Sequence, residues 1–421
     1  MPLRKVEGTQ RTVSAEETIA RAWPVARSLG VTRLSDITGL DRIGIPVWSA
    51  VVPKSDDGLS VYNGKGLHSL DAKAGALMEA IERQTALKMR LPVICGSYDE
   101  LRRARNVLAP HSLREILARD YSERQTYAWV AGRDLLSGRE ILVPAKFAGY
   151  LWNDVPHNSC FAWNSSNGIA AGNNREEAIC QALCELIERD AWTLAEIGAH
   201  LLPWVRHRIA DPGSIDTARD DDEFIPAIDL EDDPIIELFQ QAGLHPVLHD
   251  ITTDLAIPTV FATVADDTLP GFPMVHCGLG SHPDARVAAR RALTEAAQSR
   301  CVDIQGVRED IDPVDAPSSV GNLHTRRVRS VNRGQWQLGK SKRRRRLAEL
   351  PSVEHDDVGL DLRHLLSRLR AGGVGQAIVV DFTPPDAPFA VVRVIVPELE
   401  TWSLTRAPMG RRAQDFWRRH A

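Results

Sequence analysis

One short pattern occurs three times in this chain of 421 residues and constrains its fold more than any other feature. The copies begin at Ala72, Ala178 and Ala288 and share the spacing A-x-x-x-A-L-x-E-x-x-[E/Q]. An arginine follows the first two copies directly, whereas Ser299 follows the third. Chance supplies one such segment easily, but three in one chain indicate a repeated helical element.

The repeated pattern predicts a helix with two different faces. At 3.6 residues per turn, the two alanines, the first glutamate and the arginine position lie within about 60° of one another. The leucine and the aliphatic residue four positions later, such as Leu77 and Ile81, point to the opposite side. We therefore expect an aliphatic face that packs in the core, and a face of small residues and carboxylates that can be approached closely.

The acidic face suggests a metal site. A single copy is well explained as an amphipathic helix with a solvated surface, but glutamates three residues apart repel slightly and stabilise nothing by themselves. If the three helices converge, their oxygens form a cluster that hard divalent cations would neutralise, and magnesium commonly takes a few carboxylates together with substrate phosphates. The candidate ligands are Glu79, Glu82, Glu185, Glu188, Glu295 and Gln298.

Glycine-rich segments precede two of these helices. Gly66 lies 13 residues before Glu79, and Gly172 lies 13 residues before Glu185. We expect NGKG and SSNGIAAGNN to be loops whose backbone N–H groups cradle anions at a helix start. Lys65, Arg290 and Arg291 are candidate cationic partners. The chain has no G-x-x-x-x-G-K-[ST] phosphate loop, so a nucleotide site here would be built differently.

Helices alternate with strands along the rest of the chain, which predicts an α/β or α+β protein with layered sheets. A helix capped by Ser14 is expected at Ala15–Ser28. A helix followed by two strands is expected twice: residues 235–241 with strands ending at Asp250 and along IPTVFATVAD, and residues 362–369 with strands ending at Asp381 and along FAVVRVIVPE. The basic run KRRRR, residues 342–346, is interpreted as a solvated surface segment, with a docking patch for an acidic peptide as the alternative.

Composition excludes several classes of protein. The formal net charge is −5 and the pI about 6.2, which argue against a nucleic-acid binder. No apolar stretch is long enough to span a membrane, and the N-terminus lacks the pattern of a secretory signal. The six cysteines include no C-x-x-C pair. A cytoplasmic protein is expected.

The repeated segments resemble the YcaO superfamily. The resemblance rests on GKG followed by EAIER, on SSNGIAAGNNREEAICQALCELIER and on RRALTEAAQSR, and it extends over residues 11–412. It implies a layered fold with internal pseudo-symmetry, in which residues 1–40 form an N-terminal helical segment contributing to the nucleotide site and residues 41–412 form the catalytic domain. ATP would sit among the repeated helices, with the six oxygen ligands holding Mg2+. Nucleotide contacts carried over by motif are Arg11, Lys65, Asn173, Glu177, Arg189 and Arg291.

The resemblance also implies a reaction. Family members use ATP to activate a backbone amide: a nucleophile adds to the carbonyl, the oxyanion takes the γ-phosphoryl group, and phosphate leaves. Phosphoryl transfer needs positioning and charge neutralisation more than a covalent catalyst, so no serine or cysteine nucleophile is assigned.

The C-terminal sequence bears on the product. Members that form azolines usually end in a Pro-rich tail, which this chain lacks. Its ending is more similar to members with a TfuA-type partner, which install thioamides. Thioamidation of a ribosomal peptide or protein, with a TfuA-type partner and a sulfur donor, is therefore the leading hypothesis, and a homodimer is plausible. The alternatives are azoline cyclodehydration, a non-catalytic nucleotide-binding or scaffolding subunit, and a purely structural protein.

Overall fold

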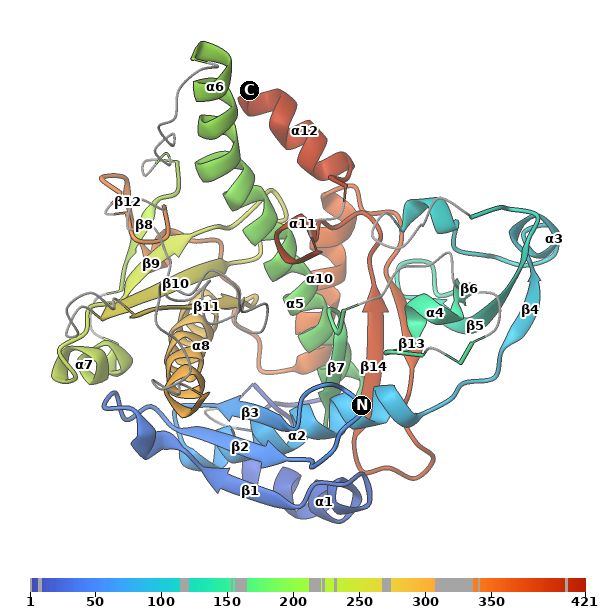
Figure 1. The fold of residues 1–421 in the computed structure, drawn as a ribbon, viewed down its shortest axis with the longest axis horizontal. Helices are drawn as coiled ribbons and strands as arrows, with labels where there is room; N and C mark the ends of the chain where they lie inside the picture. Colours follow the sequence, from blue (N-terminus) through green and yellow to red (C-terminus); the bar gives the residue numbers. More distant parts are fainter. Residues whose placement is uncertain are drawn as a thin grey trace, which may run out of the picture.

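The computed structural model describes residues 2–6, 10–113, 121–152, 154–155, 165–211, 221, 224–230, 233–266, 274–306, 336–339, 341–405 and 408–421. These residues form three sheets surrounded by helices (Figure 1). The mixed α/β class with layered sheets, predicted from the sequence, is confirmed.

The first sheet belongs to a helix–strand–strand–strand–helix unit. Its strands are antiparallel in the order β1-β2-β3, and the last strand leads into the first repeated helix. The elements are α1 (Ala15–Ser28), β1 (Arg33–Asp36), β2 (Val47–Val51), β3 (Val61–Lys65) and α2 (Ser69–Lys88). The Ser14 side chain accepts a hydrogen bond from the Glu17 N–H, which confirms the predicted cap of α1.

The same unit occurs again around the third repeated helix. Strands β9, β10 and β11 are antiparallel neighbours, and β11 leads into the helix. The elements are α7 (Pro234–Gln241), β9 (Val247–Asp250), β10 (Thr259–Asp266), β11 (Met274–Ser281) and α8 (Ala285–Gly306). The helix and two strands predicted from residue 235 onward are therefore confirmed.

A third such unit is assembled from two distant parts of the chain. Its first half, predicted as the second helix–strand–strand pattern, is α10 (Val358–Ala371), β13 (Ile378–Asp381) and β14 (Ala390–Ile395). Its second half precedes this by more than 160 residues and consists of β7 (Ile169–Gly172) and α5 (Arg175–Glu196). Antiparallel pairing of β14 with β7 joins the halves. The internal repeat is thus one unit present three times, with one copy split in sequence.

Additional elements extend two of the sheets. The six-stranded sheet has the order β4-β5-β13-β14-β7, with β6 paired to β5, and the five-stranded sheet has the order β11-β10-β9-β8-β12. The added strands and the short helices beside them are β4 (Ile94–Ser97), α3 (Tyr98–Leu101), β5 (Thr126–Asp134), β6 (Glu140–Pro144), α4 (Ala145–Ala148), β8 (Ala227–Asp229) and β12 (Arg344–Arg346).

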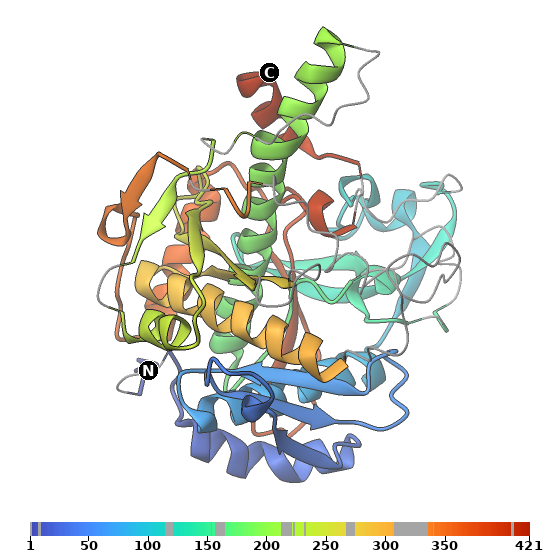
Figure 2. The same ribbon diagram turned by 60° about the vertical axis from the view of Figure 1, so that its left-hand side comes forward.

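Helix α5 continues beyond the repeated segment. A π-helical turn at Ile197–Leu201 leads into α6 (Leu202–Ala210). After β14 come α11 (Trp402–Thr405) and α12 (Arg411–His420). Both views show α6 and α12 projecting together from one end of the molecule (Figures 1 and 2). Among the described residues, no helix combines the length and the apolar character that crossing a membrane requires.

The basic run includes the short strand β12, and four of its five residues are exposed, which confirms its interpretation as a solvated surface segment. β12 pairs with β8 in parallel, and Arg344 forms an ion pair with Asp229. The side chains of Arg345 and Asp250 are 2.5 Å apart. Acidic residues on neighbouring strands of the sheet offset the positive charge of the basic run. The sequence around residues 342–346 does not indicate these ion pairs.

The two glycine-rich segments were predicted as loops, and this was wrong for the part of each that forms a strand. VYNGK forms β3 with Tyr62 buried, and IAAG forms β7. Their glycines permit close packing: a Cβ on Gly64 would lie 2.1 Å from the Ala72 carbonyl oxygen and 2.1 Å from the Ala76 nitrogen. Because Asn and Gly are typical of turns, the sequence did not indicate these two strands, whose backbones pack closely against helices.

The small face of each repeated helix is the surface that these strands approach. In the third unit, a Cβ on Gly278 would lie 2.1 Å from the Ala292 carbonyl oxygen. On the opposite side, Leu77 and Ile81 are fully buried in the hydrophobic core, as predicted. The close approach expected from the alanines is therefore made by the preceding strand of the same unit.

The three units contact one another in a cyclic order. Each repeated helix packs on its own strand and on the corresponding strand of a neighbour: α2 on β7, α5 on β11 and α8 on β3. In Figure 1, α5 runs through the middle of the molecule, with α8 beside it and α2 below. Each of these three strands ends the order of its sheet among the described residues. Three sheet edges and three acidic helices are thereby brought together.

Substituting Gly64 with alanine should destabilise the protein by about 1–3 kcal/mol or more, because the added methyl group overlaps the backbone of α2. The free energy of unfolding from urea titration measures the effect. Gly39→Ala is the matched control, since a Cβ there has nothing within 4 Å. Equal stabilities for the two variants would contradict the close strand–helix packing.

Candidate functional site

The first glutamate of each repeated helix caps a sheet edge. Glu79 accepts a hydrogen bond from the Asn63 N–H at 3.1 Å, and Glu295 accepts one from the Leu279 N–H at 3.3 Å. The backbone of Gly168, just before β7, donates to Glu185. Edge strands carry backbone groups that no neighbouring strand pairs. In all three units, a backbone N–H group at the edge of a sheet therefore orients the first glutamate.

The second polar position of the helix connects neighbouring units. Glu82 accepts a hydrogen bond from the Ala171 N–H of β7 at 3.2 Å, and the Gln298 amide donates to the Asn63 carbonyl oxygen of β3 at 3.1 Å. The shared motif therefore does more than repeat: its second polar position joins a helix of one unit to a strand of the next.

Burial and mutual repulsion shift the titration of this cluster. Burial raises the pKa of Glu79 and of Glu185. It raises the pKa of Glu82 well above the ordinary value, and the charges of Glu185 and Glu79 add to this effect. The pKa of Glu188 is raised to about 7 by burial, and the charge of Glu295 contributes. The cluster therefore favours the uptake of positive charge.

Lys65 partly supplies that charge to Glu295. Burial alone would raise the pKa of Glu295, but the nearby charges of Lys65 and Arg189 outweigh it and lower the pKa. The Lys65 ammonium nitrogen lies 2.5 Å from a Glu295 carboxylate oxygen and connects β3 of one unit with α8 of another. The ammonium group occupies a position that suits a cation.

The motif arginines differ in their contacts. The Arg189 guanidinium lies 3.6 Å from a Glu188 oxygen and 5.6 Å from the Trp192 ring centre. Its buried Nε has no hydrogen-bond partner among the described residues. Arg83, at the same position of the first copy, instead pairs with buried Asp57 at 3.2 Å and stacks on Tyr150. Arg189 therefore forms an ion pair with the carboxylate cluster, whereas the charge of Arg83 lowers the pKa of Glu79 and Glu82 while its ion pair is with Asp57.

The arrangement fits a divalent cation that shares its ligands with a phosphate group. Within the described parts of the chain, no group of three or more His, Cys, Asp or Glu side chains is arranged so that it could hold a metal ion by itself. Magnesium commonly keeps an open coordination sphere, with few protein carboxylates and the remaining positions filled by substrate phosphates and water. The raised pKa of Glu82 and the ammonium of Lys65 beside Glu295 both indicate that a positive charge is favourable in this cluster.

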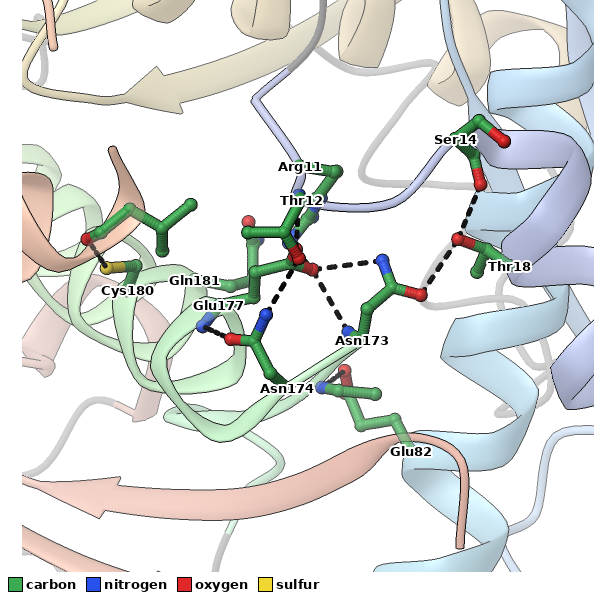
Figure 3. A network of polar contacts seen from close by, with 12 residues as sticks. Arg11, Thr12, Ser14, Thr18, Glu82, Asn173, Asn174, Glu177, Cys180 and Gln181 are labelled. Atoms are coloured by element: carbon green, nitrogen blue, oxygen red, sulfur yellow. Dashed lines mark hydrogen bonds and ion pairs between the residues drawn. The ribbon is translucent and has the colours of Figure 1, made fainter. Parts of the chain in front are cut away.

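A second polar network ties the N-terminal segment to the start of α5 (Figure 3). Glu177 is buried and accepts hydrogen bonds from the Thr12 N–H and hydroxyl, both at 2.6 Å. It also accepts from the Asn173 N–H at 3.0 Å and the Asn173 side-chain amide at 3.1 Å. The Arg11 guanidinium lies 3.7 Å from the same carboxylate. A carboxylate has about four acceptor positions, so protein donors already occupy Glu177.

The remaining predicted cations lie in different places. Arg291 donates to the Gln181 side chain at 2.6 Å and therefore faces α5. Arg290, which was considered as an anion partner, instead forms an ion pair with Asp233 at 2.9 Å, at the start of α7. The predicted oxygen ligands, Lys65 and Arg189 share contacts, whereas Arg11, Asn173 and Glu177 form the separate network.

The sequence analysis missed two residues of this region. Gln181 holds Arg291, and Thr12 supplies two donors to Glu177. A helical wheel would have identified Gln181, because position 181 lies close to Glu188 around the helix axis. No local signal distinguishes Thr12, whose role depends on a contact across 165 residues.

Glu188 should make the metal-free protein less stable as the pH rises. Its pKa in the folded chain, about 7, exceeds the ordinary value of 4.5, so the folded state keeps this proton to a higher pH than the unfolded chain. The associated free energy of unfolding is lost between about pH 4.5 and pH 7. Glu188→Gln is expected to be more stable than the native chain by about 1–3 kcal/mol near pH 8, and little different near pH 5.

Urea unfolding in a chelator at both pH values measures this difference. Glu237→Gln is the control, because Glu237 is exposed on α7, away from the cluster. An equal gain in both variants, or no gain for Glu188→Gln near pH 8, would contradict the raised pKa.

Comparison with known proteins agrees with this geometry. Residues 63–400 match the family model described as YcaO cyclodehydratase, ATP- and Mg2+-binding. The chain is 35% identical over 406 residues to an uncharacterised protein of Methanothermobacter thermautotrophicus, covering 96% of this chain and 98% of that protein. It is 33% identical over 396 residues to an uncharacterised protein in the tfuA 3' region of Rhizobium leguminosarum bv. trifolii, covering 93% and 88%.

Solved structures share the fold. YcaO from Methanopyrus kandleri, bound with AMPPCP and Mg2+, matches with a TM-score of 0.68 and 22% identity over 95% of this chain and 96% of that one. A heterocyclase in complex with substrate and cofactor matches with a TM-score of 0.72 and 22% identity over 95% of this chain and 54% of that one. This chain spans about half the length of the heterocyclase. From the family model and the relatives together, the chain belongs to the YcaO family of ATP- and Mg2+-binding cyclodehydratases.

Proposed function

We infer that this protein uses ATP and Mg2+ to activate a backbone amide of a peptide or protein. The observation that carries this inference is the convergence of the acidic faces of α2, α5 and α8 on one cluster, where Lys65 contacts Glu295 at 2.5 Å. A purely structural role does not account for this cluster, because the pKa values of four glutamates are raised there.

Each unit would contribute to the metal and phosphate site. Residues that would hold Mg2+ are Glu79, Glu82, Glu185, Glu188, Glu295 and Gln298. Lys65 would exchange Glu295 for a phosphate oxygen, and Arg189 has an unpaired Nε to donate to phosphate. Arg291, held by Gln181, is oriented toward α5. Gln298 is the one uncharged residue among the predicted metal ligands, so it would not add to the repulsion between the carboxylates.

The N-terminal segment would complete the site indirectly. Because protein donors already occupy Glu177, its role is to position Arg11 and Asn173 rather than to contact the nucleotide. Thr18 of α1 donates to the Asn173 side-chain oxygen at 2.8 Å and adds a second restraint. We therefore propose that residues 1–40 contribute to the nucleotide site and that residues 41–412 form the catalytic domain.

When bound, ATP with Mg2+ supplies the phosphoryl group that converts an amide oxygen into a leaving group. The residues of this chain would place the phosphates, neutralise their charge and hold the amide carbonyl in line, which is most of what phosphoryl transfer requires. No serine or cysteine nucleophile is needed for this chemistry.

We favour thioamidation as the outcome, with a sulfur nucleophile replacing the amide oxygen. Support comes from the relative in the tfuA 3' region, which agrees with a TfuA-type partner. The proposal also requires a sulfur donor. The alternative, azoline formation, is supported by the fold shared with a heterocyclase. A non-catalytic subunit is disfavoured because every expected ligand position is retained. A cytoplasmic location and a homodimer stay predictions from the sequence.

Binding of Mg–ATP should depend on the repeated glutamates. Calorimetry is expected to show magnesium-dependent binding to the native chain, weakened at least roughly tenfold in Glu79→Gln and Glu185→Gln, because each change removes a charged ligand. Glu237→Gln on α7 serves as the control. Binding that is tight and indifferent to both changes would place the nucleotide elsewhere.

The product distinguishes the two chemistries by mass. Peptide mass spectrometry should compare cells that make the native chain with cells that make Glu185→Gln. Thioamidation exchanges an oxygen for a sulfur and raises the mass of one peptide, whereas azoline formation lowers the mass by one water. A water loss that depends on the native chain would replace the thioamide proposal by cyclodehydration.

A further inference from the structure

A pocket of about 610 Å3 lies between the N-terminal segment and the start of α10. Pockets of this size hold small ligands. Its walls come from residues 2–4, from parts of residues 356–366 and from Glu176 in the first turn of α5. The predicted metal ligands and nucleotide contacts all lie in the described part of the chain, and none of them lines this pocket. The pocket is therefore separate from the two polar networks described above.

A buried carboxyl group lines the pocket and lacks one hydrogen-bond partner. Asp357 is 8% exposed, and its Oδ1 caps α10 by accepting a hydrogen bond from the Leu360 N–H at 3.0 Å. Its Oδ2 has no partner among the described residues. Capping the helix needs only one of the two oxygens, and a buried acceptor without a donor is costly. The pocket therefore favours a ligand that brings a hydrogen-bond donor to Asp357.

Charged groups of both signs surround Asp357. Glu176 and Asp356 add two further carboxyl groups to the lining, and Arg4 and Arg363 add two guanidinium groups. Both arginines are exposed, whereas Asp357 is buried. Arg4 is opposite Asp357 in an antiparallel bridge, but its guanidinium does not pair with Oδ2. Three carboxyl groups and two guanidinium groups favour a cation over an anion inside this pocket.

The rest of the lining is aliphatic. Leu3, Leu362 and Leu366 are half-buried, and Leu360 is 36% exposed. An aliphatic side chain placed against these leucines would remove apolar surface from water, which is favourable. A ligand that suits this pocket therefore combines a cationic donor with an aliphatic group.

The first residue of a peptide has this combination. Its ammonium group offers three N–H donors, as the ammonium group of lysine does, and its side chain and carbonyl oxygen follow within a few bonds. Carboxyl groups, leucines and guanidinium groups in the pocket match these three features in turn. Capture of an N-terminal amine is an established mode of peptide recognition.

The pocket does not open onto the carboxylate cluster. Glu176 and Glu185 are nine residues apart on α5, which places them about 180° apart around the helix axis. Helix α10, which supplies most of the leucines, packs on α5. A peptide held in the pocket is therefore bound at a second place, away from the proposed reaction site.

We propose that this pocket binds the N-terminal residue of a polypeptide that begins with an aliphatic side chain. The ammonium group donates to Asp357 and Glu176, and the side chain packs against Leu360 and Leu366. The exposed guanidinium group of Arg363 donates to the first carbonyl oxygen. The inference does not depend on the proposed chemistry, because it concerns a separate binding site. It gives this protein a means of recognising another polypeptide by its free N-terminus.

The probe is L-leucylglycinamide, and N-acetyl-L-leucylglycinamide is its matched control without the ammonium group. Affinity for the full chain is measured by titration with saturation-transfer NMR. The acetylated peptide should bind at least about tenfold more weakly, because a hydrogen bond to a charged group contributes at least that ratio. Glycylglycinamide, which lacks the aliphatic side chain, should also bind more weakly than the probe.

Two variants test the assigned residues. Asp357→Asn keeps the size of the side chain and the helix cap, because Asn caps helices as well as Asp does, and it should lower the affinity for the probe about tenfold. Glu176→Gln should lower it less, because Glu176 is only partly buried. Glu237→Gln, exposed on α7 and outside the pocket, is the control. Thermal unfolding confirms that each variant is folded.

The outcomes separate the possible ligands. Equal affinity for the free and the acetylated peptide, or no binding of either, overturns the proposal. Stronger binding of 4-methylpentanoate than of the probe identifies an anion site formed by Arg4 and Arg363 instead. Unchanged affinity in both variants moves the peptide elsewhere, and if Asp357→Asn does not fold, unchanged affinity in Glu176→Gln is decisive by itself. The proposed function is tested separately, because none of these measurements involves Mg–ATP.

Discussion

The organisation of this protein depends on hydrogen bonds between glutamate carboxylates and unpaired backbone N–H groups at three sheet edges. Glu79, Glu185 and Glu295 each accept from the strand segment that precedes their own helix. An edge strand that is neither paired nor covered exposes polar backbone groups, and a buried carboxylate needs donors. The carboxylates accept hydrogen bonds from the edge N–H groups, and these N–H groups supply the donors that the buried carboxylates need. The three carboxylates are thereby held in fixed orientations.

Close packing of helices on strands makes this convergence possible. Alanines on the helices and glycines such as Gly64 and Gly278 on the strands let backbones approach where any Cβ would collide. The short separation brings the carboxylates of one unit to the strand of the next, as with Glu82 and Ala171. Burial of the carboxylates and repulsion between them are the energetic cost, visible in the pKa of Glu188, which burial and the charge of Glu295 raise to about 7. A bound cation would relieve this cost.

The sequence predicted correctly the features that depend on side-chain spacing within a single helix or strand. The faces of α2 and α5, the cap of α1 and the two helix–strand–strand patterns all follow from side-chain spacing. The strands β3 and β7 were missed because Asn and Gly are typical of turns, although here glycine allows a helix to approach. The basic strand β12 was missed because its arginines are compensated by Asp229 and Asp250 on strands more than 90 residues away in the sequence.

The motif alone established that three similar helices exist, that each has a carboxylate-bearing small face, and that the family resemblance implies ATP and Mg2+. Tertiary structure decided which of those residues are in contact. Lys65 pairs with Glu295, and Arg83 pairs with Asp57. Protein N–H and hydroxyl groups occupy the acceptor positions of Glu177. It also assembled one unit from α10, β13, β14, β7 and α5. The physical reason is that periodicity reports the faces of single elements, whereas contacts between elements depend on which strand backbones pair across the chain.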